Sequence, residues 1–386
     1  MKKIIDTKNP LNCVACTSCV NTCPSNAIEL RPDSEGFLYP IINKEKCLSC
    51  GLCAKSCPMD KVNNNFTPLA YAAKSNDKEI LKQSSSGGIF YYLAEEVIKN
   101  NGTVFGAALT DENFVKHIGV DNIENIIKLI GSKYVQSDLN ETFSIIKEKL
   151  NNNQKVLFVG TPCQVAGLNF FLKNKTKNLI TVDLICHGVP SPKVFKKYIE
   201  HIEKCFKKKI NHISFRNKKI NWSRFSFVAE FTDKTEFSEE FTHNTYMKGF
   251  INNLFLRPSC YHCHFKNGNY FSDITLGDFW GIKKINPELH SDLGVSLCCI
   301  NSKRGADIFD AIKPNLTATN IPFEEAVKYN SAYTTCVKTN NMREWFFKHL
   351  EKTPIEKNIN QSLSPKLFAR LLLKIQKRKY ISDKWN

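Results

Sequence analysis

The sequence has no apolar run that approaches the ~18 residues a helix needs to span a bilayer. Its start, MKKIIDTKNPLNC, carries basic residues but no continuous apolar stretch after them, unlike a secretory signal peptide. The chain also has no basic helix with base-reading side chains and no stripe in which aromatic and basic residues interleave. These absences predict a cytoplasmic protein that has no nucleic-acid partner.

Length, composition and charge are those of a soluble protein with more than one domain. The chain has 386 residues, more than one ordinary core accommodates, and 42% of them are hydrophobic. Lys and Arg outnumber Asp and Glu by 54 to 37, which gives a formal net charge of +17. This basic excess favours acidic protein partners, anionic cofactors or an anionic membrane surface.

Cysteine is plentiful, with 16 residues, and eight of them fall into an internal repeat. CVACTSCVNTCP at 13–24 recurs as CLSCGLCAKSCP at 47–58. In a reducing compartment such spacing indicates metal ligands. Bacterial two-cluster ferredoxins show this run, and the fourth cysteine of each run binds the other cluster. We therefore predict two [4Fe–4S] clusters, one on a first set of Cys13, Cys16, Cys19 and Cys57 and one on a second set of Cys47, Cys50, Cys53 and Cys23.

A pair of zinc sites is the alternative, because C-x2-C pairs also bind zinc. Zinc takes its ligands in two separated pairs, whereas each run here supplies three tightly spaced thiols followed by Cys-Pro. The spacing favours clusters. Residues 1–62 are therefore predicted to form an α+β ferredoxin-like domain with two [4Fe–4S] clusters.

After a polar stretch at 61–68 the pattern changes to alternating strands and helices. Strands are predicted at 69–74, 103–109, 114–120, 155–160, 179–186, 213–215, 224–231 and 294–300. Helices are predicted at 87–102, 122–131, 141–150, 163–173 and 191–206. This order predicts α/β structure with a mixed, partly parallel sheet, divided into a region at 69–150 and a region at 151–345.

Four further cysteines lie in settings that suggest a ligand site. Cys163 in GTPCQVAGL and Cys186 in DLICHGVPS each follow a predicted strand, and Cys260 and Cys263 form CYHC. Ligands bind at strand ends of open α/β sheets, so these four thiols could hold a third [4Fe–4S] cluster. They could instead be small buried hydrophobic residues, or CYHC and a histidine could bind zinc.

The remaining four cysteines have no such context. Cys298 and Cys299 lie inside an apolar strand and are interpreted as core residues. Nothing around Cys205 or Cys336 suggests a ligand.

Two polar loops are candidates for holding a cofactor. SSSGG at 84–88 directly precedes a predicted helix, so its backbone N–H groups and hydroxyls could cradle a phosphate, or it could be a plain N-cap. GSKYVQSD at 131–138 places Lys133, Gln136 and Ser137 between predicted helices. A third segment, SDITLGDFWG at 272–281, ends a predicted strand, and its loop could bring the backbone close to a ring system or could be a simple turn.

The segments GTPCQVAGL, DLICHGVPS, C-x2-C-x-F and DITLGDFWG together resemble the coenzyme F-420 hydrogenase/dehydrogenase beta-subunit family over about residues 69–320. Members of that family are iron–sulfur flavoproteins that bind FAD and pass electrons to or from a hydride-carrying partner, a deazaflavin in the founding members. The N-terminal ferredoxin domain resembles a common fusion in the family. The resemblance implies the third cluster on Cys163, Cys186, Cys260 and Cys263. It also implies an FAD site, for which the candidate contacts are Ser86, Gly87, Gly88, Lys133, Gln136, Ser137, Thr161 and Gln164.

Two residues are candidates for catalytic roles in such a site. His187, beside Cys186, could relay a proton or donate an N–H to sulfur, and it could equally be a structural histidine. Asp278 could orient the flavin or the substrate, or it could cap a turn.

These features predict an iron–sulfur flavin oxidoreductase. Electrons would run between a low-potential donor, [4Fe–4S] clusters, FAD and a small hydride acceptor, in either direction, because a flavin joins one-electron and two-electron chemistry. The acceptor would be a deazaflavin or another metabolite, for example in polysaccharide synthesis. The expected partner is a ferredoxin or an oxidoreductase subunit, and the alternative is a non-catalytic electron-transfer subunit.

The last segment, residues 346–386, is predicted to be a basic helical tail. KLFARLLLKIQKRKY at 366–380 has the pattern of a basic amphipathic helix. It could pack on its own domain, or it could contact a partner or the surface of a membrane.

Overall fold

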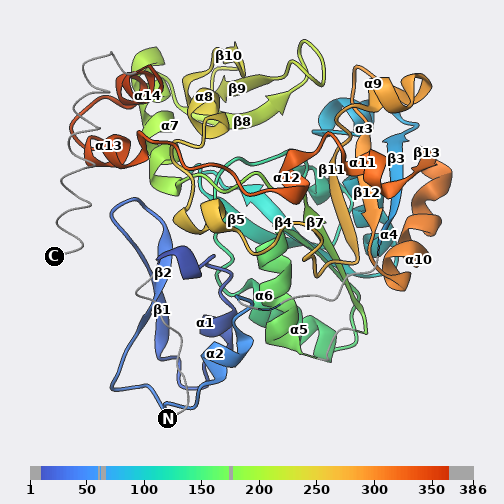
Figure 1. The fold of residues 1–386 in the computed structure, drawn as a ribbon, viewed down its shortest axis with the longest axis horizontal. Coiled ribbons are helices and arrows are strands. Elements are labelled where there is room, and N and C mark those ends of the chain that lie inside the picture. The colour runs from blue at the N-terminus through green and yellow to red at the C-terminus, as the bar shows by residue number, and fades with distance from the viewer. Residues whose placement is uncertain (1–9, 60, 62–66, 174–176, 365–386) are drawn as a thin grey trace.

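The computed structural model describes residues 10–59, 61, 67–173 and 177–364. Figure 1 shows an N-terminal domain beside a larger body that contains a long sheet and a second, smaller sheet. The predicted helix at 366–380 lies outside the described residues, as does most of the polar stretch at 61–68.

The N-terminal domain is built on the internal repeat. Each cysteine run enters a short helix after a residue with left-handed backbone, Thr17 (φ 63°) before the first and Gly51 (φ 74°) before the second. The two helices pack on each other, and Ser18 Oγ donates to the Ser56 carbonyl at 2.8 Å. The domain's elements are η1 (Pro10–Asn12), α1 (Ser18–Thr22), the antiparallel pair β1 (Ile28–Pro32) and β2 (Leu38–Ile42), and α2 (Leu52–Ser56).

An eight-stranded sheet forms the centre of the larger body, in the spatial order β13–β3–β12–β11–β7–β6–β4–β5. The pairs β4–β6, β6–β7 and β7–β11 are parallel, and the other neighbours are antiparallel. The prediction of a mixed, partly parallel sheet is therefore confirmed. Both predicted regions, 69–150 and 151–345, contribute strands to it: β3 (Leu69–Ser75), β4 (Thr103–Leu109), β5 (Val115–Val120), β6 (Val156–Gly160), β7 (Leu179–Leu184), β11 (Ile274–Asp278), β12 (Ser296–Ile300) and β13 (Leu316–Ile321).

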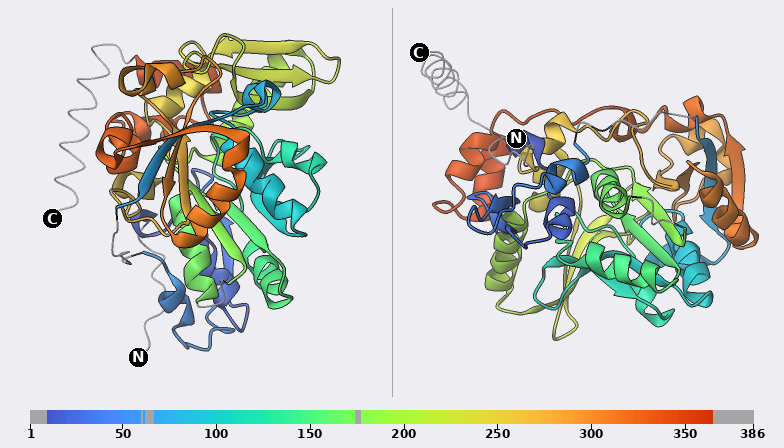
Figure 2. Two further views of the ribbon diagram at one scale, coloured as in Figure 1. Left: turned by 90° about the vertical axis from the view of Figure 1, so that its right-hand side faces the viewer. Right: turned by 90° about the horizontal axis from the view of Figure 1, so that it is seen from below.

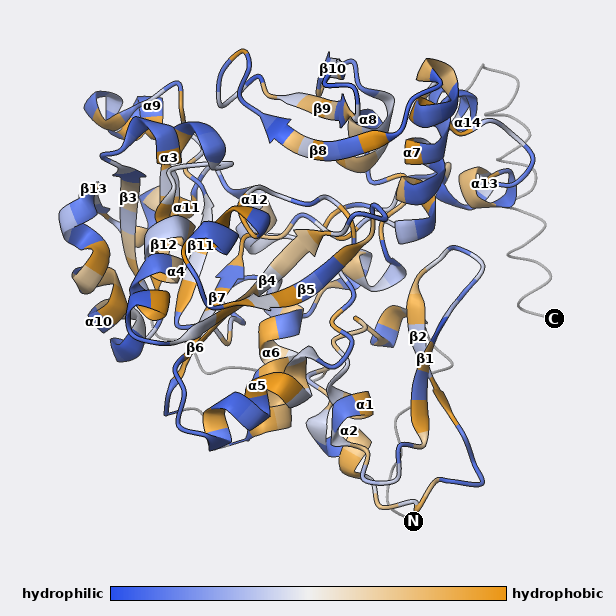
Figure 3. Ribbon diagram, turned by 180° about the vertical axis from the view of Figure 1, so that it is seen from behind, coloured by the Kyte–Doolittle hydropathy of each residue, from blue (hydrophilic) through white to orange (hydrophobic). Residues whose placement is uncertain are grey.

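Helices cover both faces of this sheet. Strand β6 shows why, because Leu157 and Val159 pack toward one face while Val156 and Phe158 pack toward the other. The first face is covered by α4 (Ile89–Lys99) and α10 (Lys303–Ile312), and the second by α5 (Thr142–Asn151), α6 (Pro162–Leu172) and shorter helices. In Figure 3, α5 and α10 carry both hydrophobic and hydrophilic residues, as helices with one buried side do.

A smaller antiparallel sheet, in the order β10–β9–β8, lies above the long sheet in Figure 1 and at one end of the molecule in the left view of Figure 2. It shares an aromatic-rich core with four helices. This unit comprises β8 (Ile210–Asn217), β9 (Ser226–Phe231), β10 (Glu236–Glu240), α7 (Pro192–Phe206), α8 (Thr245–Ile251), α13 (Arg343–Lys348) and α14 (Ile355–Leu363). The remaining elements are α3 (Lys78–Gln83), η2 (Glu124–Lys128), η3 (Pro258–His262), α9 (Ile282–Ile285), η4 (Pro287–Leu289), η5 (Lys313–Asn315), α11 (Phe323–Val327) and α12 (Ser331–Thr334).

The predicted helix at 122–131 is wrong. The segment forms only the short 3-10 helix η2; the Lys133 ammonium then donates to the carbonyls of Lys128 and Ile130, and the chain turns at Gly131 (φ 86°). Strands β10 and β13 were not predicted, since edge strands rich in polar residues have no apolar alternation to reveal them.

The part of the predicted tail that is described, up to Ser364, includes α14, which packs through Ile355 and Ile359 into the core of the smaller sheet. Within the described residues, no helix has the length and apolar character required to cross a membrane.

Candidate functional site

The first cysteine set is gathered in space by α1 and α2. Cys16 and Cys19 are buried and lie within interaction range of Cys13 and Cys57. Burial raises the pKa of both buried thiols, and the neighbouring thiols raise it further. The structure therefore brings the four predicted ligands of the first cluster together.

The second set lines one cavity in the N-terminal domain. The thiols of Cys23, Cys47, Cys50 and Cys53 contribute to its wall, with the apolar side chains of the β1–β2 hairpin around them. The Ala27 N–H donates to Cys23 Sγ at 3.3 Å, a contact of the kind that tunes the potential of cluster sulfurs.

The third set comes from three segments that are far apart in the sequence. Cys163 lies in the first turn of α6, Cys186 follows β7, and Cys260 and Cys263 lie in and after η3. Burial raises the pKa of the Cys163 thiol, and Cys263, Cys186 and Cys260 each raise it further, so all four side chains are within interaction range. Burial, together with these neighbours, also raises the pKa of Cys260 to about 12 and that of Cys263 to about 11.

The buried thiols of the first and third sets have the chemistry that a multi-iron cluster requires. Crowded, buried thiolates repel one another unless a cationic centre balances them, and the thiolate is the form that binds metal. Among the described residues, no three His, Cys, Asp or Glu side chains converge as a single metal ion requires. A [4Fe–4S] cluster does not need that convergence, because its four cysteines bind four different irons.

A fifth thiol, Cys336, lies beside the third set although its sequence context suggested nothing. Its Sγ donates to the Cys263 carbonyl at 3.3 Å, so it is directed at the backbone. Cys298 and Cys299 are fully buried in β12, as expected for core residues.

The first and third sets are adjacent. Cys57, Cys163 and Cys263 all belong to the apolar cluster around Ala166 and Phe265. Helix α6, which carries Cys163, also packs on the first set so closely that a Cβ on its Gly167 would lie 2.6 Å from the Cys16 Cβ. The sheet and α6 thus place two cysteine sets on either side of one thin apolar layer.

The predicted cofactor loops meet at the end of the sheet formed by β11 and β12. Ser85 Oγ in SSSGG accepts from the Ser132 N–H at 2.7 Å, which joins this loop to the loop at 131–138. Ser86 Oγ donates to the Val295 carbonyl, and the Gly87 N–H donates to Ser296 Oγ, which lies opposite Asp278 in the strand register. Three motifs that are separate in the sequence therefore line one region.

The glycines of SSSGG have different surroundings. A Cβ on Gly87 would lie 2.3 Å from the Ala73 carbonyl oxygen, so this position must be glycine for packing alone. Gly88 has φ 83°, and α4 begins after it without a side-chain cap, which leaves that helix N-terminus available to an anion.

The other predicted cofactor contacts separate into two groups. Thr161 and Gln164 form a capping box at the start of α6; Gln164 Nε2 donates to Ser137 Oγ at 3.0 Å, and Thr161 Oγ1 lies 3.1 Å from Cys163 Sγ. They border the third cysteine set. Gln136 lies elsewhere, since its Nε2 donates to the Val14 carbonyl in the N-terminal domain.

Three cations lie around the SSSGG region, and the two lysines among them have no carboxylate partner within the described residues. Burial lowers the pKa of Lys133 to about 7, and burial also lowers that of Lys218 to about 7. Lys218 Nζ donates to the carbonyls of Leu81, Ser86 and Leu293, and neither lysine forms an ion pair with a described residue. Arg216 pairs with Asp278, yet its buried Nε and Nη2 have no hydrogen-bond partner among the described residues. An anionic ligand such as a diphosphate would complement these groups.

The two predicted catalytic residues have partners within the protein. Asp278 pairs with Arg216 and accepts from Trp222 Nε1 at 2.7 Å, and Trp222 stacks on Trp280 with ring centroids 5.0 Å apart. His187 Nε2 lies 2.7 Å from Asn253 Oδ1, and burial lowers its pKa. Each side chain is therefore held in a fixed orientation, and a catalytic role for either stays a prediction.

Sequence reasoning missed Arg216, Lys218 and Trp222. The available signal was the basic and aromatic stretch RNKKINWSRF at 216–225, between two strands. Only the fold brings this stretch to the SSSGG loop, through the Arg216–Asp278 ion pair and the Lys218–Ser86 hydrogen bond.

Comparison with known proteins identifies two regions of the chain. Residues 12–61 match the 4Fe-4S dicluster domain, and residues 153–325 match the family described as the C terminus of the beta subunit of coenzyme F420 hydrogenase/dehydrogenase. No curated protein matches the chain. Among solved structures, the chain is similar to a chain of the F420-reducing [NiFe] hydrogenase complex from Methanosarcina barkeri, with 19% identity, a TM-score of 0.47, and coverage of 70% of this chain and 91% of that one.

Proposed function

Residues 12–61 form a 4Fe–4S dicluster domain, and residues 153–325 belong to the family of C-terminal regions of coenzyme F420 hydrogenase/dehydrogenase beta subunits. From this premise we propose that the protein is an iron–sulfur flavin oxidoreductase. It would relay electrons between a low-potential protein donor and a small hydride-accepting molecule, in either direction. The two N-terminal [4Fe–4S] clusters would be joined by a third cluster and by FAD. When bound, FAD would supply the exchange between single electrons and a hydride.

The observation that carries the proposal is the convergence of Cys163, Cys186, Cys260 and Cys263 next to the first cysteine set. Four cysteines from three segments converge here, and although burial keeps the metal-free thiols protonated, a bound cluster would take them as thiolates and balance their charge. A cluster bound by them would lie behind α6, between the N-terminal domain and the polar loops.

The protein's own side chains would hold the flavin at those loops. Arg216 and Lys218 would supply positive charge near a diphosphate, and the N-terminus of α4 would supply backbone N–H groups. Asp278 would orient Arg216 and Trp222 and, through them, the flavin or the substrate. The Trp222–Trp280 pair would shield one side of this region from water.

The substrate follows only by family analogy, which favours a deazaflavin coenzyme, with another metabolite such as one in polysaccharide synthesis as the alternative. The compartment we propose is the cytoplasm, in keeping with sixteen free thiols. A non-catalytic electron-transfer subunit remains the second candidate function, favoured by the dicluster domain itself. Turnover of a soluble acceptor by the purified chain supports the enzyme, and activity only with an added subunit supports the alternative.

Metal and flavin analysis of anaerobically purified protein tests the proposal. Three clusters require about twelve irons per chain, and two require about eight. Cys163→Ala and Cys260→Ala should each lose about four irons, whereas Cys336→Ala, whose thiol is directed at a carbonyl, should lose none. An iron count near eight in the unmodified protein, or full iron content in Cys163→Ala and Cys260→Ala, would contradict the third cluster.

The same preparations test the flavin site. The protein should release about one FAD per chain on denaturation, and Arg216→Gln should reduce FAD retention at least tenfold because buried positive charge is lost. The matched control is Arg224→Gln, whose guanidinium is exposed and pairs with Glu240 on the same small sheet. Equal FAD retention in the two variants would remove Arg216 from the site.

A further inference from the structure

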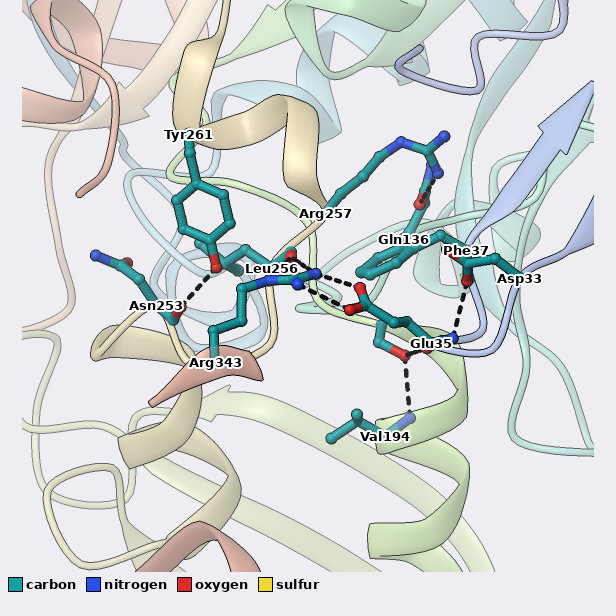
Figure 4. Close-up of polar contacts among 11 residues, drawn as sticks. Asp33, Glu35, Phe37, Gln136, Val194, Asn253, Leu256, Arg257, Tyr261 and Arg343 are labelled. Atoms are coloured by element: carbon teal, nitrogen blue, oxygen red, sulfur yellow. Dashed lines mark hydrogen bonds and ion pairs between the residues drawn. The ribbon is translucent and has the colours of Figure 1, made fainter. Parts of the chain in front are cut away.

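Two arginines cross the contact between the N-terminal domain and the larger body, and they differ in how their charges are balanced (Figure 4). Arg343 makes a two-pronged ion pair with Glu35, with Nη1 donating to Oε1 at 2.8 Å and Nη2 reaching Oε2. Its charge is therefore neutralised by a carboxylate. Arg257, 1% exposed, forms no ion pair with any described residue.

The Arg257 guanidinium donates its hydrogen bonds to neutral oxygens. Nε donates to the Cys13 carbonyl at 2.9 Å, Nη2 to the Leu38 carbonyl at 2.9 Å, and Nη1 to Gln136 Oε1 at 3.1 Å. The guanidinium also lies over the ring of Tyr39, 4.3 Å from its centroid. These contacts fix its position but supply no negative charge, and a buried unpaired cation is costly.

The two ends of Arg257 belong to two different cysteine sets. Its side chain holds the backbone of Cys13, a ligand of the first set. Its backbone carbonyl accepts from the Cys260 N–H at 2.9 Å, so it starts the turn that carries two ligands of the third set. Its own N–H donates to the Val189 carbonyl, and the Val189 N–H donates to Cys260 Sγ at 3.5 Å.

We propose that Arg257 is the shared counter-charge of the first and third cluster sites and holds them in a fixed relation. This inference rests on the proposed function, because it requires clusters on both sets. Four thiolates leave a [4Fe–4S] site with net negative charge, and reduction adds one more. A buried cation between two such sites favours reduction at both and thus raises both potentials.

The test is a redox titration of the full chain with dithionite, followed by electron paramagnetic resonance under anaerobic conditions. In Arg257→Gln the potentials of the first and third clusters should fall by about 59 mV or more, which is a tenfold change in each reduction equilibrium, while the second cluster keeps its potential. Arg257→Lys, which keeps the charge, should restore most of the loss. Gln136→Glu, which places a carboxylate on Arg257 and gives up only the Gln136 Nε2 bond to the Val14 carbonyl, should lower the same two potentials.

The control is the double variant Glu35→Gln/Arg343→Gln, which removes the neighbouring interdomain ion pair without changing net charge. It should leave all three potentials in place. Unchanged potentials in both Arg257→Gln and Gln136→Glu with full iron, or equal shifts at all clusters or in the control, would overturn the proposal. A count of eight irons in the unmodified chain would contradict the third cluster of the proposed function. The potential of the first cluster would still show whether Arg257 acts on that cluster.

Discussion

At the scale of single residues, His117 is a buried histidine whose two ring nitrogens both have partners. Nδ1 lies 2.9 Å from Ser137 Oγ, and Nε2 lies 3.1 Å from the Val159 carbonyl. Burial lowers the pKa of His117 from its ordinary 6.5 to about 4. The ring therefore stays neutral at neutral pH and links β5 to the Ser137–Gln164 contact at the start of α6.

This pKa predicts how stability depends on pH. Between pH 6.5 and pH 4 the unfolded chain binds a proton on His117 that the folded chain does not, so acidification destabilises the fold, by about 2 kcal/mol at pH 5. The loss should be absent above pH 7. His117→Asn should reduce this part of the difference in urea midpoint between pH 5 and pH 7.5. A difference as large in the variant as in the unmodified chain would show that other groups cause it.

At the scale of elements, α6 connects the N-terminal domain to the sheet. Its first turn carries Cys163, its middle contacts Cys16 through Gly167, and its apolar residues pack on β6. The helix is apolar almost all round, because it is buried against the sheet on one side and the cysteine domain on the other. The close approach of α6 to the first cysteine set therefore requires a residue without a Cβ at position 167, which is Gly167.

Gly167→Ala should destabilise the protein although alanine favours helix. The intrinsic preference would add up to about 1 kcal/mol of stability. Overpacking against the Cys16 side chain, where the new Cβ would lie 2.8 Å from Sγ, should cost more, about 1–3 kcal/mol, and should reduce iron at the first cluster. Urea denaturation and iron analysis measure both effects. Gly106→Ala is the matched control, since its Cβ would meet nothing nearer than 3.5 Å.

At the scale of the whole molecule, the three cysteine sets follow one another. Cys19 and Cys53 pack together and join the first set to the second. Cys57, Cys163 and Cys263 pack together and join the first set to the third. The first set therefore lies between the other two, and the second set, beside the exposed Leu48, is the end farthest along this series.

We expect an external protein donor to deliver electrons at the second set. Deleting the N-terminal domain is a poor test, because it would expose Ala166, Phe265 and the partners of Arg257. Cys50→Ala should instead remove the second cluster alone and slow reduction of the flavin by a reduced ferredoxin at least tenfold. Dithionite, which is small, should still reduce the flavin at the normal rate. Reduction by ferredoxin at the full rate would mean that the donor enters at another set.

The sequence by itself determined the local chemistry. Cys47, Cys50 and Cys53 lie a few residues apart on one tight loop. They are therefore close in space whatever the rest of the fold, and their spacing alone predicts that they share a cluster. The alternation of predicted strands and helices likewise predicts α/β structure with a mixed sheet, because apolar strands and helices in that order are buried by packing the helices on the sheet. The helix predicted at 122–131 is only a 3-10 helix at Glu124–Lys128, and the carbonyls that follow it bond to Lys133, which lies outside the segment.

The tertiary structure decided everything that depends on pairing between distant segments. The fold brings Cys163, Cys186 and Cys260 together across about a hundred residues, a proximity that no local pattern encodes. It also decided that Arg257, an ordinary arginine in the sequence, is buried without a carboxylate between two cysteine sets. The charge balance of a buried group is set by its neighbours in space, so it follows only from the fold.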